Sequence, residues 1–246
     1  MDGMNTAIKG LATSAFEQIK ADILKGRLRP EERLRVQGLS QRYGIGATGI
    51  REALSRLVTD GLVAAEDQRG FCVVPISREE LLDLTTTRVG IEKLALSQAV
   101  QNGDLDWETN VLSSYHRLSR TPVPDTPEKH DAWALAHRQF HEALASGCKS
   151  PWLMHLGRML YDQSERYRNI AEEYTRPESR DALNEHEQLM EAAMARDASK
   201  LCELVDMHLW TTTNIILSAV FDKTPSKTPE KRARGRSRSA RGSSAN

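Results

Sequence analysis

The chain has little of what marks a membrane protein or a disulfide-stabilised protein. Its three cysteines among 246 residues form no disulfide framework, and so few cysteines are typical of a reducing compartment. No apolar run approaches the roughly 18 residues of a membrane helix. The first ten residues also lack the apolar segment of a signal peptide. We therefore expect a cytoplasmic protein without a membrane partner.

The chain also lacks an overall charge, but its charges are unevenly distributed. Residues 222–246 contain eight basic and two acidic residues, whereas residues 78–221 contain fifteen basic and twenty-three acidic ones. The terminal segment is rich in Ser, Pro, Gly and Arg, which predicts a disordered basic tail. Such a tail either adds non-specific attraction to phosphates or only keeps the protein soluble, and the sequence leaves both interpretations open.

Residues 1–76 have the pattern of a small DNA-binding domain. Apolar residues at helical spacing predict a helix at 14–25 and a short helix at 36–43. Thr48 is expected to cap a third helix that ends at Asp60. Candidate strands at 62–65 and 71–74 flank a turn, the wing, at 66–70. This order predicts a winged helix-turn-helix, which places one helix in the major groove of DNA.

Six residues of this domain are candidate DNA contacts. They are Arg35, Thr48, Arg51, Arg56, Arg69 and Gly70. Arg51 lies in the first turns of the third helix, from where it can donate two hydrogen bonds to a guanine edge. We expect Arg35 and Arg56 to contact phosphates, and Thr48 to contact a phosphate or a base. The Arg69-Gly70 turn is expected to enter the minor groove. The alternative for Arg51 is a solvated surface arginine, but the surrounding order of elements favours the DNA contact.

Residues 77–221 predict an all-helical bundle, so the chain is mainly α. Six helices are expected. They begin at Ser77, at Asp104, near Pro127, at Ser150, at Pro177 and at Asp197. Ser77 forms a capping box with Glu80, and Pro151 follows Ser150 in the first turn of its helix. Phe221 is the expected end of the last helix. We expect this domain to bind a ligand and a metal and to mediate dimerisation.

Four of the seven histidines lie on apolar faces of three expected helices. They are His137, His141, His186 and His208. Inside a bundle they can converge, and nitrogen-rich sites of this kind suit Zn(II), Ni(II) and similar divalent ions. The alternative is that each one is a hydrogen-bonded histidine of the core.

Arg88 interrupts an apolar stripe, so we expect it to point into the bundle. A buried arginine needs an anionic partner. That partner is either an internal glutamate or the carboxylate of a ligand, which a guanidinium binds in bidentate fashion. Arg166, Tyr167 and Arg168, near the end of the fourth expected helix, offer further donors for such a ligand, and we select Arg166 and Tyr167 as candidate ligand-binding residues.

Several motifs carry a resemblance to a known family. The runs ILKGRLRPEERL, IREALSRLVTDGLV and RGFCVV resemble the DNA-binding domain of the GntR family of bacterial regulators. In that family the turn before the DNA-reading helix carries Ser-Arg-Thr-Pro, whereas residues 46–49 here are Gly-Ala-Thr-Gly. Ala47 therefore stands where the resemblance implies an arginine, which suggests an altered operator preference.

The second half resembles the FCD effector domain of the FadR subfamily. The features are Arg88 with Glu92, FHEAL at 140–144, the EH pair at 185–186 and MHL at 207–209. The resemblance implies a divalent metal held by one Asp and three His. His141, His186 and His208 fall on the histidine positions and His137 on the Asp position. HRQFHEALASGC and LYDQSERYR resemble repressors of glutarate and γ-aminobutyrate utilisation, which implies a small dicarboxylate effector such as glutarate or 2-hydroxyglutarate.

The leading hypothesis is a homodimeric transcription repressor that an effector releases from a palindromic DNA operator. Two alternatives are a metalloenzyme that uses the histidine cluster and an architectural DNA-binding protein that uses the basic tail. Di-iron bundles need a Glu three residues before a His, and no histidine here has one. The sequence therefore favours a regulator without enzymatic activity.

Overall fold

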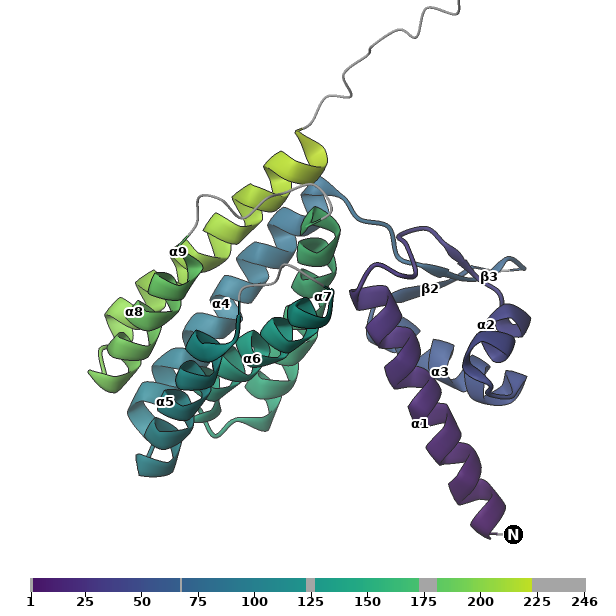
Figure 1. Cartoon of the computed structure of the whole chain (residues 1–246), viewed down its shortest axis with the longest axis horizontal. Helices are drawn as coiled ribbons and strands as arrows, with labels where there is room; N and C mark the ends of the chain where they lie inside the picture. The colour runs from purple at the N-terminus through teal and green to yellow at the C-terminus, as the bar shows by residue number, and fades with distance from the viewer. Residues whose placement is uncertain (1, 67, 123–126, 173–180, 223–246) are drawn as a thin grey trace, which may run out of the picture.

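The computed structural model describes residues 2–222 except 67, 123–126 and 173–180. A small N-terminal unit lies beside a longer bundle of helices (Figure 1). The N-terminal unit contains α1 (Asp2–Leu24), β1 (Arg33–Leu34), α2 (Val36–Tyr43), α3 (Ala47–Thr59), β2 (Val63–Glu66) and β3 (Gly70–Val73). The basic tail predicted at 222–246 lies, from residue 223 on, outside the described residues.

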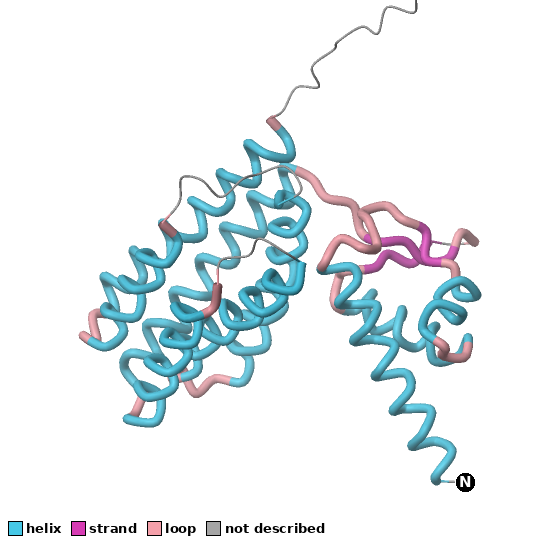
Figure 2. The backbone as a smooth tube through the Cα atoms, in the orientation of Figure 1, coloured by secondary structure: helices cyan, strands magenta, loops and turns pink. Residues whose placement is uncertain are grey.

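The three strands form one small antiparallel sheet in the order β1-β3-β2, at one edge of the N-terminal unit (Figure 2). Strands β2 and β3 are the two predicted strands, shifted by one residue, and Glu66 pairs with Gly70 at the wing. Gly70 has a φ of 86°, a conformation that glycine adopts without steric cost. Strand β1 was not predicted, because two residues are too short to show an alternating pattern.

Two predictions for the helices of this unit were wrong in detail. Helix α1 begins at Asp2 rather than at residue 14, although it ends next to Gly26 as expected. Thr48 does not cap α3, because that helix begins at Ala47 and Gly46 occupies the cap position without a side-chain bond. Thr48 instead lies exposed in the first turn of α3.

Helices α1 and α3 pack against each other and, together with the sheet, enclose the N-terminal core. Its fully buried side chains include Ile19, Ile23, Leu28, Ile50, Leu54, Leu57 and Leu62. Gly49 packs tightly against the turn before α3, since a Cβ there would lie 3.0 Å from Cγ2 of Ile45, whereas the backbone of Ala12 on α1 would be at an ordinary contact distance of 3.9 Å.

The C-terminal bundle is all-helical, as the sequence predicts. It contains α4 (Arg78–Asn102), α5 (Leu105–Arg120), α6 (Pro127–Ser146), α7 (Pro151–Glu172), α8 (Ala182–Met194), α9 (Ala198–Ile216) and the π-helical turn η1 (Leu217–Phe221). The side chains of Ser77, Asp104 and Asp197 accept bonds from backbone N–H groups in the first turns of their helices, as expected. Asp181 caps α8, and the predicted start at Pro177 falls outside the described residues.

Trp107 closes one end of the bundle, where α4, α5 and α6 meet. Its indole Nε1 donates to the carbonyl oxygens of Ala143 and Leu144, at 3.1 and 3.2 Å. Gly103 and Gly147 pack so tightly around the ring that an added Cβ would lie 2.3 and 3.0 Å from it. In the described part of the chain, no helix combines the length and the apolar character needed to cross a membrane.

We expect the substitution Gly103→Ala to lower the free energy of unfolding by about 1–3 kcal/mol, because the methyl group overlaps the ring of Trp107 and the carbonyl oxygen of Ala99. Urea denaturation measures this change. Gly90→Ala is the matched control: a Cβ at this exposed position in α4 meets nothing within 4 Å, so better helix propensity should stabilise the protein by up to about 1 kcal/mol. Equal stability of the Gly103→Ala variant and the parent protein would contradict the packing described here.

Candidate functional site

The exposed face of α3 carries the candidate DNA-reading residues. Arg51 and Thr48 are solvent-exposed in its first turns, whereas Ile50 and Leu54 are buried against the core. This amphipathic placement leaves the N-terminal part of α3 free to enter a major groove, where the first turns of a DNA-reading helix contact base edges.

The remaining candidate DNA contacts occupy different places. Arg35 directly precedes α2, and Arg69 and Gly70 form part of the wing; all three are exposed. Arg56 lies in the last turn of α3, where its guanidinium stacks 4.1 Å from the centre of the Phe16 ring and donates to Thr13 at 3.4 Å. Arg56 is thus held against α1, and its phosphate contact stays a prediction.

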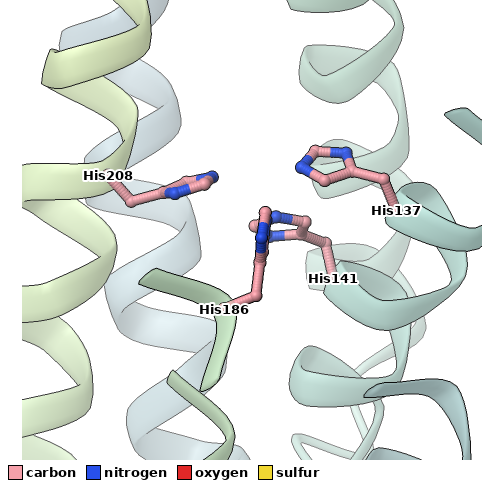
Figure 3. Close-up of side chains that lie close together, drawn as sticks. All are labelled: His137, His141, His186 and His208. Carbon is pink, nitrogen blue, oxygen red and sulfur yellow. The ribbon is translucent and has the colours of Figure 1, made fainter. Parts of the chain in front are cut away.

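The structure brings the four predicted histidines together in the centre of the bundle (Figure 3). His137 and His141 come from α6, His186 from α8 and His208 from α9. One ring nitrogen from each of them lies within 4.8 Å of those of the other three, and all four side chains are buried. The i, i+4 spacing on α6 places two of the rings side by side, with centroids 4.6 Å apart.

The contacts of the individual rings fit a metal site better than a set of ordinary core histidines. His141 Nε2 is buried without a hydrogen-bond partner among the described residues, which is an unusual and costly state for a core polar atom. On the outer side of the cluster, His208 Nδ1 lies 2.8 Å from the carboxylate of Glu185. A carboxylate behind a histidine is the usual support of a metal ligand, and nitrogen donors of this kind suit zinc or nickel.

Burial keeps the imidazoles of His137 and His141 neutral. It lowers the pKa of His137 and of His141 well below the usual 6.5. The positive charge of Arg168 adds to this effect at His137, and the neighbouring His208 and His186 add to it at His141. Neutral imidazole is the form that binds metal ions.

A small pocket, partly open to solvent, adjoins the histidine cluster. Its lining includes the charged or titratable residues Arg88, His137, Arg168 and His208 and the hydroxyl groups of Thr85, Ser164, Thr212 and Thr213. Arg88 is buried, as expected, and its Nε donates to Glu92 at 2.6 Å. Glu92 is therefore the internal glutamate that was one of the two expected partners of Arg88. Neither Nη of Arg88 has a hydrogen-bond partner among the described residues, so both remain available for a ligand carboxylate.

The structure places Arg166 and Tyr167 away from this cavity. Arg166 donates to the carbonyl oxygens of Val74 and Pro75, at 3.4 and 3.3 Å. Tyr167 donates to Glu80. Both residues hold the segment between β3 and α4, whereas the neighbouring Arg168 lines the cavity.

Of the three consecutive donors expected near the end of this helix, Arg168 is the one that lines the cavity, and Tyr161, which the sequence analysis did not select, contacts it. Arg168 donates to Glu165, to the hydroxyl of Tyr161 at 2.9 Å and to Nδ1 of His137 at 3.2 Å. The signal was present in the sequence, because residues 161, 165 and 168 are spaced to share one face of a helix. Three consecutive residues, such as 166–168, cannot all face one cavity from a helix.

Helix α7 also contacts the N-terminal unit, on the side of the bundle that faces α1 (Figure 1). Asp162 forms an ion pair with Lys20 of α1 at 2.7 Å. Gln163 donates to the carbonyl oxygen of Asp60 at 2.9 Å, and Asn169 donates to that of Leu24 at 2.6 Å. The helix that lines the cavity thus touches the N-terminal unit directly.

We expect the metal-free protein to lose stability in mild acid, because the unfolded chain protonates His137 and His141 near pH 6.5 while the folded state holds both neutral. The stabilisation is complete above pH 6.5 and is lost as the pH falls below it. From pH 7.5 to 5.5 the loss is about 1.4 kcal/mol for each histidine, measured by urea denaturation with a chelator present. The double variant His137→Gln/His141→Gln is the control, and an equally large loss in it would contradict the assignment.

Comparison with known proteins agrees with both halves of the structure. Residues 11–73 match the model of the bacterial regulatory proteins of the gntR family, and residues 83–210 match the FCD domain. The HTH-type transcriptional regulator BphR of Paraburkholderia xenovorans is 41% identical over 85% of this chain and 86% of its own. The HTH-type transcriptional repressor GlaR of Escherichia coli is 37% identical over 83% of this chain and 95% of its own.

A solved structure shows the same fold. Escherichia coli McbR/YncC superimposes with a TM-score of 0.72 at 21% identity, over 85% of this chain and 97% of that one. The matched families and relatives are regulators, which rules against the metalloenzyme alternative. The chain therefore belongs to the GntR family of transcriptional regulators, with an N-terminal GntR helix-turn-helix domain and a C-terminal FCD domain.

Proposed function

We propose that this regulator is a repressor that binds a palindromic operator as a homodimer and releases it when a small dicarboxylate binds. Residues 1–76 form the DNA-binding domain in this proposal, and residues 77–221 form the effector and dimerisation domain. The single observation that carries it is the cavity with Arg88 and Arg168 beside four converging histidines. The relative GlaR, a repressor by name, supports the direction of regulation.

The cavity suits a short dicarboxylate such as glutarate or 2-hydroxyglutarate. The free Nη groups of Arg88 offer a planar pair of donors for one carboxylate. Arg168 and the hydroxyl groups of the lining offer donors at other points of the same cavity. The cluster of His137, His141, His186 and His208 contains the nitrogen donors that would hold a zinc or nickel ion, and a bound ion would add positive charge for an effector carboxylate.

Helix α7 provides the route from the effector to the DNA. Arg168 faces the cavity and is paired with Glu165, while Asp162, Gln163 and Asn169 hold the DNA-binding unit. An anion in the cavity competes with Glu165 for Arg168, and the resulting shift of α7 changes the orientation of the two DNA-binding units in the dimer. The coupling is reciprocal, so operator DNA must weaken effector binding by the same factor.

An operator-release assay tests the proposal. The protein is bound to an operator selected from random duplexes, and a panel of dicarboxylates from malonate to adipate is added with and without chelator. We expect release by a C5 dicarboxylate and a weaker response after metal removal. If no member of the panel releases the operator or shifts the melting temperature, the sensing half of the proposal is wrong.

We expect Arg51→Ala to reduce the preference for the selected operator over random DNA by about 10- to 100-fold, because a bidentate guanine contact is lost. Arg35→Ala is the matched control at an exposed phosphate-binding position. It should weaken binding to both DNAs alike and reduce by about one unit the slope of the logarithm of the binding constant against the logarithm of the salt concentration. Fluorescence anisotropy at several salt concentrations measures both effects. Loss of affinity for operator and random DNA alike in Arg51→Ala would contradict base reading.

We expect Arg88→Lys to raise the effector concentration needed for release by about tenfold or more, because lysine keeps the charge but loses the two-donor fork. Operator affinity without effector should stay unchanged. Arg117→Lys, an exposed change on α5, serves as the control and should leave both quantities unaltered. A normal effector response in Arg88→Lys would remove Arg88 from the site.

A further inference from the structure

His137 differs from the other histidines of the cluster in what its outer nitrogen contacts. Nδ1 of His137 lies 2.8 Å from the hydroxyl of Tyr161 and 3.2 Å from Nη1 of Arg168. Nη2 of the same Arg168 donates to the Tyr161 hydroxyl at 2.9 Å. Tyr161 therefore accepts from Arg168, which leaves its own proton to be donated to His137.

These contacts decide where the ring proton of His137 resides. A guanidinium has only donors, so Nδ1 of His137 must accept from Arg168 and from Tyr161. In a neutral imidazole the single proton then lies on Nε2. A nitrogen that carries a proton has no lone pair for a metal ion, but it is a hydrogen-bond donor.

His208 has the opposite arrangement. Its Nδ1 lies 2.8 Å from the carboxylate of Glu185, which can only accept. The proton of His208 therefore lies on Nδ1, so its Nε2 carries a lone pair, as a metal ligand requires. His141 Nε2 is buried and has no hydrogen-bond partner in the described chain, which also suits a ligand.

We infer that His141, His186 and His208 alone hold the metal, and that His137 donates a hydrogen bond from Nε2 to the carboxylate of the bound effector. This inference rests on the proposed function, since it names the role of one residue in the same site. His137 lines the cavity together with Arg88 and Arg168, so its N–H adds a third kind of donor there. Three-nitrogen sites keep a coordination position open for an oxygen ligand, and a carboxylate supplies that oxygen.

The test separates metal binding from effector binding in the full-length protein. The metal is removed with chelator, and zinc affinity is measured by competition with a chromophoric chelator. The variants are His137→Ala, His137→Gln and, as the ligand control, His141→Ala. The affinity of the zinc-loaded proteins for glutarate is then measured by calorimetry. The absorption spectrum of the cobalt(II)-loaded proteins reports the set of metal ligands independently of any effector.

We expect both His137 variants to bind one zinc ion with an affinity within about threefold of the parent protein and with an unchanged cobalt spectrum. His141→Ala should lose about 100-fold or more in zinc affinity. Glutarate affinity should fall about tenfold or more in His137→Ala. It should recover to within a few-fold of the parent in His137→Gln, because the side-chain amide of glutamine can donate from nearly the same place.

Two results would overturn the inference. One is a loss of zinc affinity in His137→Ala as large as in His141→Ala, since His137 would then be a metal ligand. The other is unchanged glutarate affinity in His137→Ala, since no hydrogen bond would then be lost. If the parent protein binds no dicarboxylate at all, the proposed effector and the donor role both fail, while the zinc and cobalt measurements still decide the ligand set.

Discussion

Charges inside the helical bundle must be paired, and the rest of the effector domain depends on that constraint. The guanidinium carbons of Arg88, Arg138 and Arg168 lie 5.0, 4.6 and 5.1 Å from the centre of the Tyr161 ring. Among the described residues, these cations are paired with the carboxylates of Glu92, Asp162 and Glu165, respectively. Breaking one buried pair leaves an uncompensated charge, which costs several kcal/mol, so an added anion must be accommodated by rearranging the pairs.

Because of this pairing, helix α7 contacts both the cavity and the N-terminal unit. Arg168 of α7 lines the cavity and contacts Tyr161 and Glu165 of the same helix. Asp162 and Gln163, also on α7, hold α1 and the end of α3. Asp162 bonds Arg138 of the bundle and Lys20 of α1 at once. Asp162 therefore links the charges around Tyr161 to the N-terminal unit.

The same network gives chemically identical side chains different roles. His137 and His208 are both buried in one cluster, yet one has a guanidinium and a tyrosine behind it and the other a carboxylate. The partner behind each ring decides which nitrogen carries the proton, and hence whether the ring offers a lone pair or a donor to the centre of the bundle.

Local signals predicted local features well. The caps at Ser77, Asp104 and Asp197 depend on a side chain and backbone groups within three residues, and all three are as expected. The predictions that were wrong concern features that depend on contacts between distant segments of the chain. Strand β1 exists only because β3 offers it a partner. Arg166, and not Arg168, contacts Val74 and Pro75. The reason is that the two arginines lie at different angular positions around α7 and therefore face different neighbours.

The sequence by itself determined the two-part organisation, the helices and their caps, the inward position of Arg88 and the candidate histidines. These follow from periodicity and from chemistry within a few residues. Only the tertiary structure decided that the four histidines meet, that Arg168 and not Arg166 reaches them, and that α7 connects the cavity to the DNA-binding domain. Those facts depend on the packing of helices that are distant in the chain, which no local pattern records.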